Sequence, residues 1–140
     1  MNLTEMYATG VAATSPEQLK RCPIENTSKL INKKFTVLIL RNMIYQNQKH
    51  FNEFLRSIEG INPNTLSIRL QEMEKNKLIQ RRVYHNTPVN IEYSLTEKGK
   101  ELLPILDQMA AFSMKHALEI FRNGKSSCFQ EVTGRNPASF

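Results

Sequence analysis

A run of short polar and basic side chains near the middle of the sequence has the most recognisable chemistry. Its members that could reach the edges of DNA bases are Asn64, Thr65, Ser67, Ile68, Arg69 and Gln71. In the DNA major groove a guanidinium suits guanine, an amide suits adenine, and an apolar group suits the methyl of thymine. The chemistry expected of this run is therefore base recognition. The run alone is equally typical of the solvated face of an ordinary amphipathic helix.

A helix over residues 62–77 is predicted to position these side chains. Asn62 is suited to cap the helix, and Pro63 is tolerated in its first turn. The face opposite the polar run carries apolar residues at helical spacing, namely Leu66, Leu70 and Met73. That stripe predicts packing on a core.

A shorter helix is predicted just before this one. Its apolar residues recur at helical spacing and are Phe51, Phe54, Leu55 and Ile58. Gly60 follows and is expected to take the left-handed conformation that ends the helix. Two helices joined by a tight turn form a helix-turn-helix, whose second helix enters the major groove. Two further helices are predicted upstream, one opening at Cys22 and one at Phe35, and the polar connection over residues 45–50 is expected to contain a short extended piece.

After Ile79 the apolar residues alternate, which predicts two strands of a hairpin around a loop at residues 85–88. A hairpin after a helix-turn-helix is typical of a winged helix, with a wing expected over residues 80–94. Basic groups on the wing and near the helices are expected at the DNA backbone or in a minor groove. They are Lys34, Lys49, His50, Arg81, Arg82 and His85. The alternative for the two arginines is that their charge only keeps an exposed edge strand soluble.

Thr96 is predicted to cap a long last helix that runs to Phe121, in which Pro104 is expected either to bend the helix or to mark a first-turn adjustment. This helix carries more apolar surface than a small domain needs from a terminal helix, which favours a dimer interface. The residues expected there are Leu102, Ile105, Leu106, Met109 and Phe112. A core helix within a single subunit is the alternative.

Composition narrows the class of protein. The chain has 140 residues, a net charge of +6 and a pI of about 9.5, which favours an anionic partner. Between residues 20 and 49 there are seven Lys or Arg and one acidic residue. No apolar run approaches the ~20 residues that cross a bilayer, so no membrane partner is expected and the cytoplasm is the expected location. No nucleophile, metal or cofactor motif is present, so we expect neither an enzyme nor a metal site nor a cofactor.

The predicted fold is α+β and mainly helical: a winged helix-turn-helix with a two-stranded β-hairpin wing and added N- and C-terminal dimerisation helices. We expect a flexible N-terminal arm over residues 1–20, a DNA-binding and dimerisation domain over residues 21–121, and a flexible tail over residues 122–140.

Several stretches of this chain resemble the HxlR-type winged-helix transcriptional regulators, which are related in architecture to MarR-type proteins. The stretches are residues 22–25, 35–41, 51–54, 61–70, 78–81 and 92–99, together with Pro88. The last of them, with the sequence EYSLTEKG, is the most specific, and the Cys-Pro start narrows the group. The resemblance implies a homodimer on a pseudo-palindromic double-stranded DNA operator, with residues 62–77 in successive major grooves. A winged helix used as a protein-interaction module of the transcription machinery, without sequence-specific DNA binding, is the competing hypothesis.

Cys22 has two interpretations. In some proteins of the HxlR type a cysteine at this place senses oxidants, and a thiol at a helix N-terminus beside basic residues is more reactive. The alternative is a cysteine that packs as a small apolar group. Nothing in the sequence marks a pocket for a small-molecule effector.

Overall fold

The computed structural model describes residues 22–116, and its packing divides at Ile31. The first unit contributes helix α3 (Pro23–Ile31), which the sequence predicted. Glu25 and Lys29 form an ion pair of 2.8 Å along this helix, and Ile24 is 66% exposed. The predicted arm of residues 1–20 and tail of residues 122–140 lie outside the described residues, so both stay predictions.

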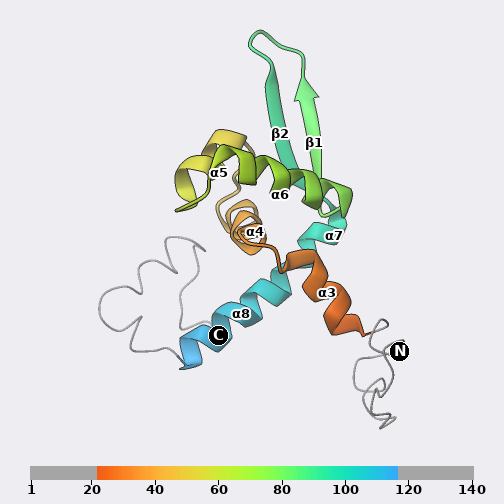
Figure 1. Cartoon of the computed structure of the whole chain (residues 1–140), viewed down its shortest axis with the longest axis vertical. Coiled ribbons are helices and arrows are strands. Elements are labelled where there is room, and N and C mark those ends of the chain that lie inside the picture. Colours follow the sequence, from red (N-terminus) through yellow and green to blue (C-terminus); the bar gives the residue numbers. More distant parts are fainter. Residues whose placement is uncertain (1–21, 117–140) are drawn as a thin grey trace. The chain divides into compact units, whose positions relative to one another are not determined.

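The second unit begins at Asn32 and follows the predicted order of helices, hairpin and helices. Its elements are α4 (Thr36–Tyr45), α5 (Phe51–Ser57), α6 (Pro63–Lys75), β1 (Ile79–Tyr84), β2 (Asn90–Leu95), α7 (Glu97–Lys100) and α8 (Leu103–His116) (Figure 1). Its buried apolar residues come from every one of these elements except α7. They include Ile39 and Leu40 of α4, both fully buried, which confirms that this helix lies at the centre of the core.

The turn between α5 and α6 has the predicted geometry. Gly60 has a φ of +79°, the left-handed conformation that costs a residue with a side chain about 1–2 kcal/mol. Asn62 caps α6, because its side-chain oxygen accepts a hydrogen bond of 2.8 Å from the Thr65 N–H, and Pro63 is the first helical residue. The helix-turn-helix is therefore confirmed, with α6 running from residue 63 to residue 75.

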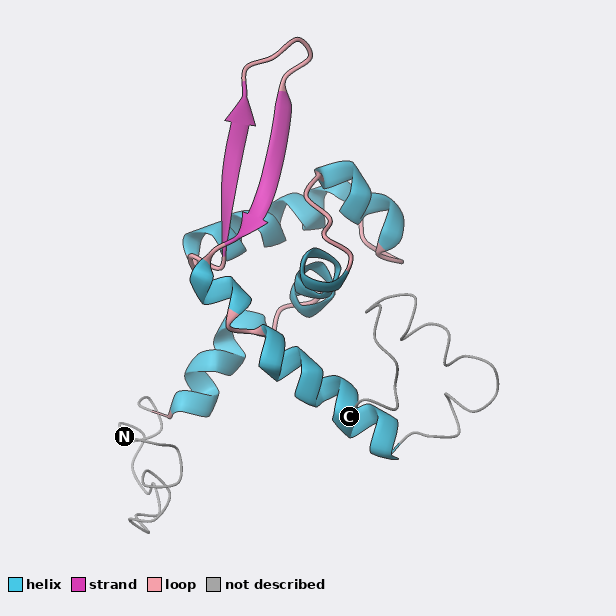
Figure 2. Ribbon diagram, turned by 180° about the vertical axis from the view of Figure 1, so that it is seen from behind, coloured by secondary structure: helices cyan, strands magenta, loops and turns pink. Residues whose placement is uncertain are grey.

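Strands β1 and β2 pair antiparallel, with Ile79 opposite Leu95 at the base of the hairpin and Tyr84 opposite Asn90 near its tip. Burial is confined to the half nearer the base: Ile79 and Tyr93 are 2% and 9% exposed, whereas Val83 and Tyr84 are 36% and 38% exposed. Figures 1 and 2 both show the hairpin extending beyond the helices. The hairpin therefore forms a wing that is anchored at one end.

The prediction of one long helix after Thr96 was wrong over the residues that are described. The chain forms the short helix α7 and then the separate helix α8, and the break falls at residues 101 and 102. Pro104 is the second residue of α8, where the missing N–H breaks no helical hydrogen bond. Of the two roles expected for Pro104, a bend inside a helix or an adjustment in a first turn, the structure shows the second.

Candidate nucleic-acid interface

Helix α6 presents a polar stripe on the side opposite its buried stripe. Leu66, Leu70 and Met73 are 0–1% exposed, which confirms the predicted core face. The opposite face exposes Asn64, Ile68, Gln71 and Lys75, which recur at spacings of four, three and four residues. Such spacing aligns side chains along one side of a helix. This exposed stripe has two amides, one branched apolar group and one ammonium, and it holds no carboxylate.

The other three predicted base-contact residues lie beside the exposed stripe. Thr65 and Ser67 are half-buried. Arg69 points elsewhere: its Nε donates a hydrogen bond of 2.9 Å to the carbonyl oxygen of Lys34, and its Nη1 lies 2.8 Å from a carboxylate oxygen of Glu72. The Arg69 side chain is only 17% exposed. In the free protein its guanidinium is therefore held against the protein.

The wing carries its positive charge near the surface. Arg81, Arg82 and His85 are all exposed, as a role at the DNA backbone requires. Arg82 stands opposite Glu92 in the strand register, and Arg81 stands opposite Tyr93. Successive residues of a strand point to opposite faces, so the two arginines lie on different faces of the wing.

Of the basic residues expected outside the wing, Lys34 and Lys49 are exposed and His50 is not. The Lys34 ammonium lies 4.9 Å from the centre of the Phe35 ring. His50 is half-buried, and its Nδ1 lies 3.2 Å from the carbonyl oxygen of Ile91. His50 therefore contacts β2 directly, near the end of the strand that adjoins the hairpin loop, which favours a role in holding the wing.

The segment before α5 is fastened by Glu53. One of its carboxylate oxygens accepts hydrogen bonds of 2.8 Å and 2.9 Å from the backbone N–H groups of Lys49 and His50. These two bonds favour the ionised carboxylate and lower the pKa of Glu53 from its ordinary value of 4.5. The Lys49 carbonyl oxygen in turn accepts a hydrogen bond of 2.8 Å from the Tyr93 N–H, but residues 46–50 form no strand, so this one bond is all that is seen of the extended piece predicted for the connection.

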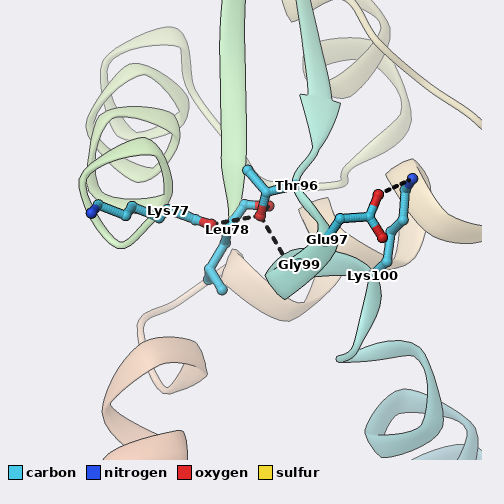
Figure 3. Close-up of polar contacts among 6 residues, drawn as sticks. All are labelled: Lys77, Leu78, Thr96, Glu97, Gly99 and Lys100. Atoms are coloured by element: carbon cyan, nitrogen blue, oxygen red, sulfur yellow. Dashed lines mark hydrogen bonds and ion pairs between the residues drawn. The ribbon is translucent and has the colours of Figure 1, made fainter.

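Hydrogen bonds among four residues join the end of α6, the end of β2 and the start of α7 (Figure 3). The Thr96 hydroxyl accepts a hydrogen bond of 3.1 Å from the Gly99 N–H, and it donates to the carbonyl oxygen of Lys77 at 2.5 Å. The Thr96 N–H donates to the Leu78 carbonyl oxygen at 3.0 Å. The sequence predicted Thr96 as a cap, but not that the same hydroxyl also contacts the carbonyl of Lys77 just after α6.

Sequence analysis also missed a buried amide in α4. Asn42 has no exposed surface, and its Nδ2 donates to Gln48 Oε1 at 3.1 Å and to Ser57 Oγ at 2.9 Å. Its Oδ1 accepts a hydrogen bond of 2.9 Å from Arg41 Nε. The signal was present, because the only amide of a mainly apolar helix must find partners when it is buried.

The five predicted interface residues lie on α8 or just before it, and their exposure divides them into two groups. Leu102 and Leu106 are 6% and 5% exposed and pack in the core of this chain, so their place in an interface stays a prediction that their burial does not favour. Ile105, Met109 and Phe112 are 36%, 47% and 69% exposed. Together with Pro104 and Gln108 these three line an open groove, which we call the α8 face. Tyr45 Oη donates a hydrogen bond of 2.5 Å to Asp107 Oδ1 and so ties α8 to α4.

Two negative findings apply to residues 22–116. No helix in this range is long and apolar enough to span a membrane. No group of three or more His, Cys, Asp or Glu side chains in this range could hold a metal ion.

A helix-turn-helix, a hairpin straight after it and a polar outer face on the second helix define a winged helix-turn-helix protein. Comparison with known proteins identifies the family. A sequence model described as HxlR-like helix-turn-helix matches residues 30–120, and the chain belongs to that family. It is a transcriptional regulator with a helix-turn-helix domain, and the proteins it resembles are regulators and not enzymes.

Three relatives illustrate the match. The HTH-type transcriptional regulator YybR of Bacillus subtilis (strain 168) is 38% identical over 104 residues, which are 73% of this chain and 82% of YybR. The structure of the redox regulator HypR in its oxidized form has a TM-score of 0.62 and 38% identity, and covers 68% of this chain and 97% of that one. A MarR-family regulator from Porphyromonas gingivalis W83 has a TM-score of 0.65 and 29% identity, and covers 76% and 99% of the two chains.

Proposed function

We propose that the chain binds a specific double-stranded DNA sequence as a homodimer, with α6 in the major groove and the β1–β2 wing on the flanking backbone or minor groove. The observation that carries this proposal is the exposed stripe of α6. Its side chains face solvent on the side away from the core and belong to the types that recognise base edges. Within that stripe, Asn64, Ile68 and Gln71 are the proposed base contacts, and Thr65 and Ser67 flank them.

The proposed backbone contacts are the exposed cations around the stripe. Arg81, Arg82 and His85 lie on the wing, and Lys34 and Lys49 lie just before α4 and α5. Phosphate contacts fix the register of a protein on DNA but read no sequence. Binding should therefore weaken steeply as the salt concentration rises, because each neutralised phosphate releases counterions.

The proposed dimer uses the α8 face. Three large apolar side chains at a spacing of four and three residues are exposed there, and water contact with such a patch is unfavourable. A two-fold dimer would present two copies of α6 to successive major grooves, about 34–36 Å apart. The operator would then be pseudo-palindromic, with half-sites one helical turn apart.

The testing experiment selects bound duplexes from a random library and measures affinity by fluorescence anisotropy over a salt series. We expect tight binding to the selected duplex, weaker binding to a scrambled duplex, and a 2:1 ratio of chains to operator. Equal affinity for both duplexes would contradict sequence-specific binding. No binding to either duplex at low salt would favour the protein-interaction module.

Single substitutions then test the proposed contacts. Asn64→Ala and Gln71→Ala should each weaken binding to the selected duplex by about 1–3 kcal/mol and relax the preference at one base pair. Asn26→Ala is the matched amide control, because Asn26 is exposed on α3 and outside the proposed contacts. An unchanged base preference in Gln71→Ala would remove Gln71 from the readout set.

The prediction that Cys22 senses oxidants stays open to a direct test. Cys22 is half-buried just before α3, and HypR is described as a redox regulator. If Cys22 senses oxidants, peroxide or diamide should change operator affinity of the wild-type chain and leave Cys22→Ser unaffected. An equal response in both would make Cys22 a packing residue. Cys128→Ser is the control for the second thiol.

A further inference from the structure

Arg69 is part of the recognition helix but its guanidinium points away from the exposed stripe. The residue lies five positions after Asn64, about 140° around the helix from it. Its Nε donates to the carbonyl oxygen of Lys34 at 2.9 Å, and its Nη1 is paired with Glu72 at 2.8 Å. The Arg69 side chain is 17% exposed, so it is more enclosed than the carboxylate that it pairs with.

The carbonyl group that Arg69 contacts lies just before α4. Phe35 is the residue that precedes the helix, and its φ of +74° turns the chain there. The helical hydrogen-bond ladder begins with the Phe35 carbonyl, which accepts from the Ile39 N–H at 2.9 Å. The Lys34 carbonyl comes one residue earlier, and a side chain 35 positions further along the sequence satisfies it. This contact fastens the middle of α6 to the turn that leads into the central helix.

Glu72 holds the guanidinium in that orientation. It is one helical turn from Arg69, and its carboxylate is 40% exposed. An arginine has a planar group with several donors in fixed directions, so two simultaneous partners define its position closely. The guanidinium thus bridges the Lys34 carbonyl and the Glu72 carboxylate, and we name this arrangement the Arg69 clamp.

We infer that Arg69 is a positioning residue, which fixes the rotation of α6 against α4 so that the exposed stripe meets the bases. The inference rests on the proposed function and refines it, because an arginine on a recognition helix would ordinarily be assigned to guanine. Arg69 acts through Asn64, Ile68 and Gln71 and touches no base itself. A small rotation of α6 would move all three of these side chains together.

Two other roles for Arg69 make different predictions. A contact with guanine would affect the preference at one base pair and leave the others unchanged. A contact with phosphate would weaken binding to every duplex and reduce the dependence on salt. A clamp affects the preference at every base pair that α6 reads, and it leaves binding to a scrambled duplex unchanged.

The experiment measures the affinity of each variant for the selected duplex and for a panel in which every base pair of one half-site is replaced in turn. Arg69→Gln should lose about tenfold in affinity for the selected duplex, the loss expected when one hydrogen bond from a charged donor is removed. Penalties across the panel should shrink together. Glu72→Gln should also lower the ratio of the affinity for the selected duplex to the affinity for the scrambled duplex. Loss of the carboxylate makes the chain more positive and strengthens binding to both duplexes, and the ratio cancels that effect.

Lys34→Ala is the matched control, because it removes the ammonium and leaves the backbone carbonyl that Arg69 contacts. It should weaken binding to every duplex and reduce the salt dependence, as expected of a phosphate contact, but keep the panel of penalties intact. Arg69→Lys keeps the charge but cannot span both partners, so it should share the pattern of Arg69→Gln. Thermal unfolding of each variant checks that the chain is folded at the temperature of the binding assay.

Loss of the preference at a single base pair in Arg69→Gln would overturn the inference in favour of a base contact. Full recovery of affinity in Arg69→Lys, or a ratio that rises in Glu72→Gln, would overturn it in favour of a contact with phosphate. Failure of the proposed function is a separate result, since it would appear as a wild-type chain that does not distinguish the selected duplex from the scrambled one.

Discussion

Replacing Gly99 with alanine should destabilise the chain strongly, although the residues next to it in the sequence give no sign of close packing. A Cβ atom added at Gly99 would lie 2.0 Å from the Leu78 carbonyl oxygen, and 3.2 Å from a side-chain carbon of Leu95. Real Cβ atoms essentially never approach other atoms within 3.0 Å, so the backbone must separate by at least about 1 Å. Because the clash is with backbone, no change of rotamer relieves it.

The size of the effect follows from what the separation disturbs. Overpacking in a well-packed region costs about 1–3 kcal/mol. If α7 retreats, the Gly99 N–H also leaves the Thr96 hydroxyl, and removal of an N-cap bond costs about 1 kcal/mol. Together they predict a destabilisation of about 2–4 kcal/mol, which is a large part of the ~5–15 kcal/mol that stabilises an ordinary domain.

Urea unfolding followed by circular dichroism measures this destabilisation directly, since the chain has no tryptophan. With a slope of about 2 kcal/mol per molar, the middle of the usual range, the midpoint should fall by roughly 1–2 M. Gly60→Ala is the matched control: its φ is +79° but nothing lies within 4 Å of the added atom, so only the conformational penalty of about 1–2 kcal/mol applies. A Gly99→Ala chain within about 0.5 kcal/mol of wild type would refute the steric argument.

Three further predictions concern charge and assembly. The backbone N–H groups of the segment before α5 lower the pKa of Glu53, so its contribution to stability is full above pH ~4.5 and is lost as pH falls through the folded pKa. Glu53→Gln should therefore unfold more easily than wild type at pH 7 and lose less stability on acidification. Urea unfolding at each pH measures both effects. Arg82→Ala should weaken binding to selected and scrambled duplexes alike and reduce the salt slope by about 1 for each phosphate that Arg82 neutralises, whereas Lys115→Ala on α8 should leave the slope unchanged. Phe112→Glu should give a monomer in sedimentation velocity and weaken operator binding, because it places a carboxylate in the apolar α8 face; a dimer that persists would exclude this face as the interface.

The sequence predicted the recognition helix well because its signals are local. Asn62 caps the helix from an adjacent position, and the buried residues recur with the period of the helix itself. The order of helices and hairpin also follows from local period. The helix-turn-helix and wing were therefore predictable, and so was the exposed stripe, which is the complement of the buried one.

What the sequence did not predict depends on partners distant along the chain. Arg69 was assigned to bases because its type fits guanine, and only the fold brings the Lys34 carbonyl to it. Leu102 and Leu106 have the same apolar character as Met109 and Phe112, but the break after α7 turns them into the core. The apolar character of a residue predicts that it is buried, but it does not tell whether the core of the chain or a partner chain buries it.

The Leu78 carbonyl lies where α6, the hairpin and α7 meet. Leu78 connects α6 to β1, and its oxygen accepts the hydrogen bond from the Thr96 N–H at the end of β2. Gly99 allows α7 to approach the same carbonyl, and the Thr96 hydroxyl reaches the neighbouring carbonyl of Lys77. The end of the recognition helix, the base of the wing and the start of α7 therefore share one backbone junction. Moving α7 away from this junction would therefore break the hydrogen bonds that join Thr96 to the carbonyls of Lys77 and Leu78.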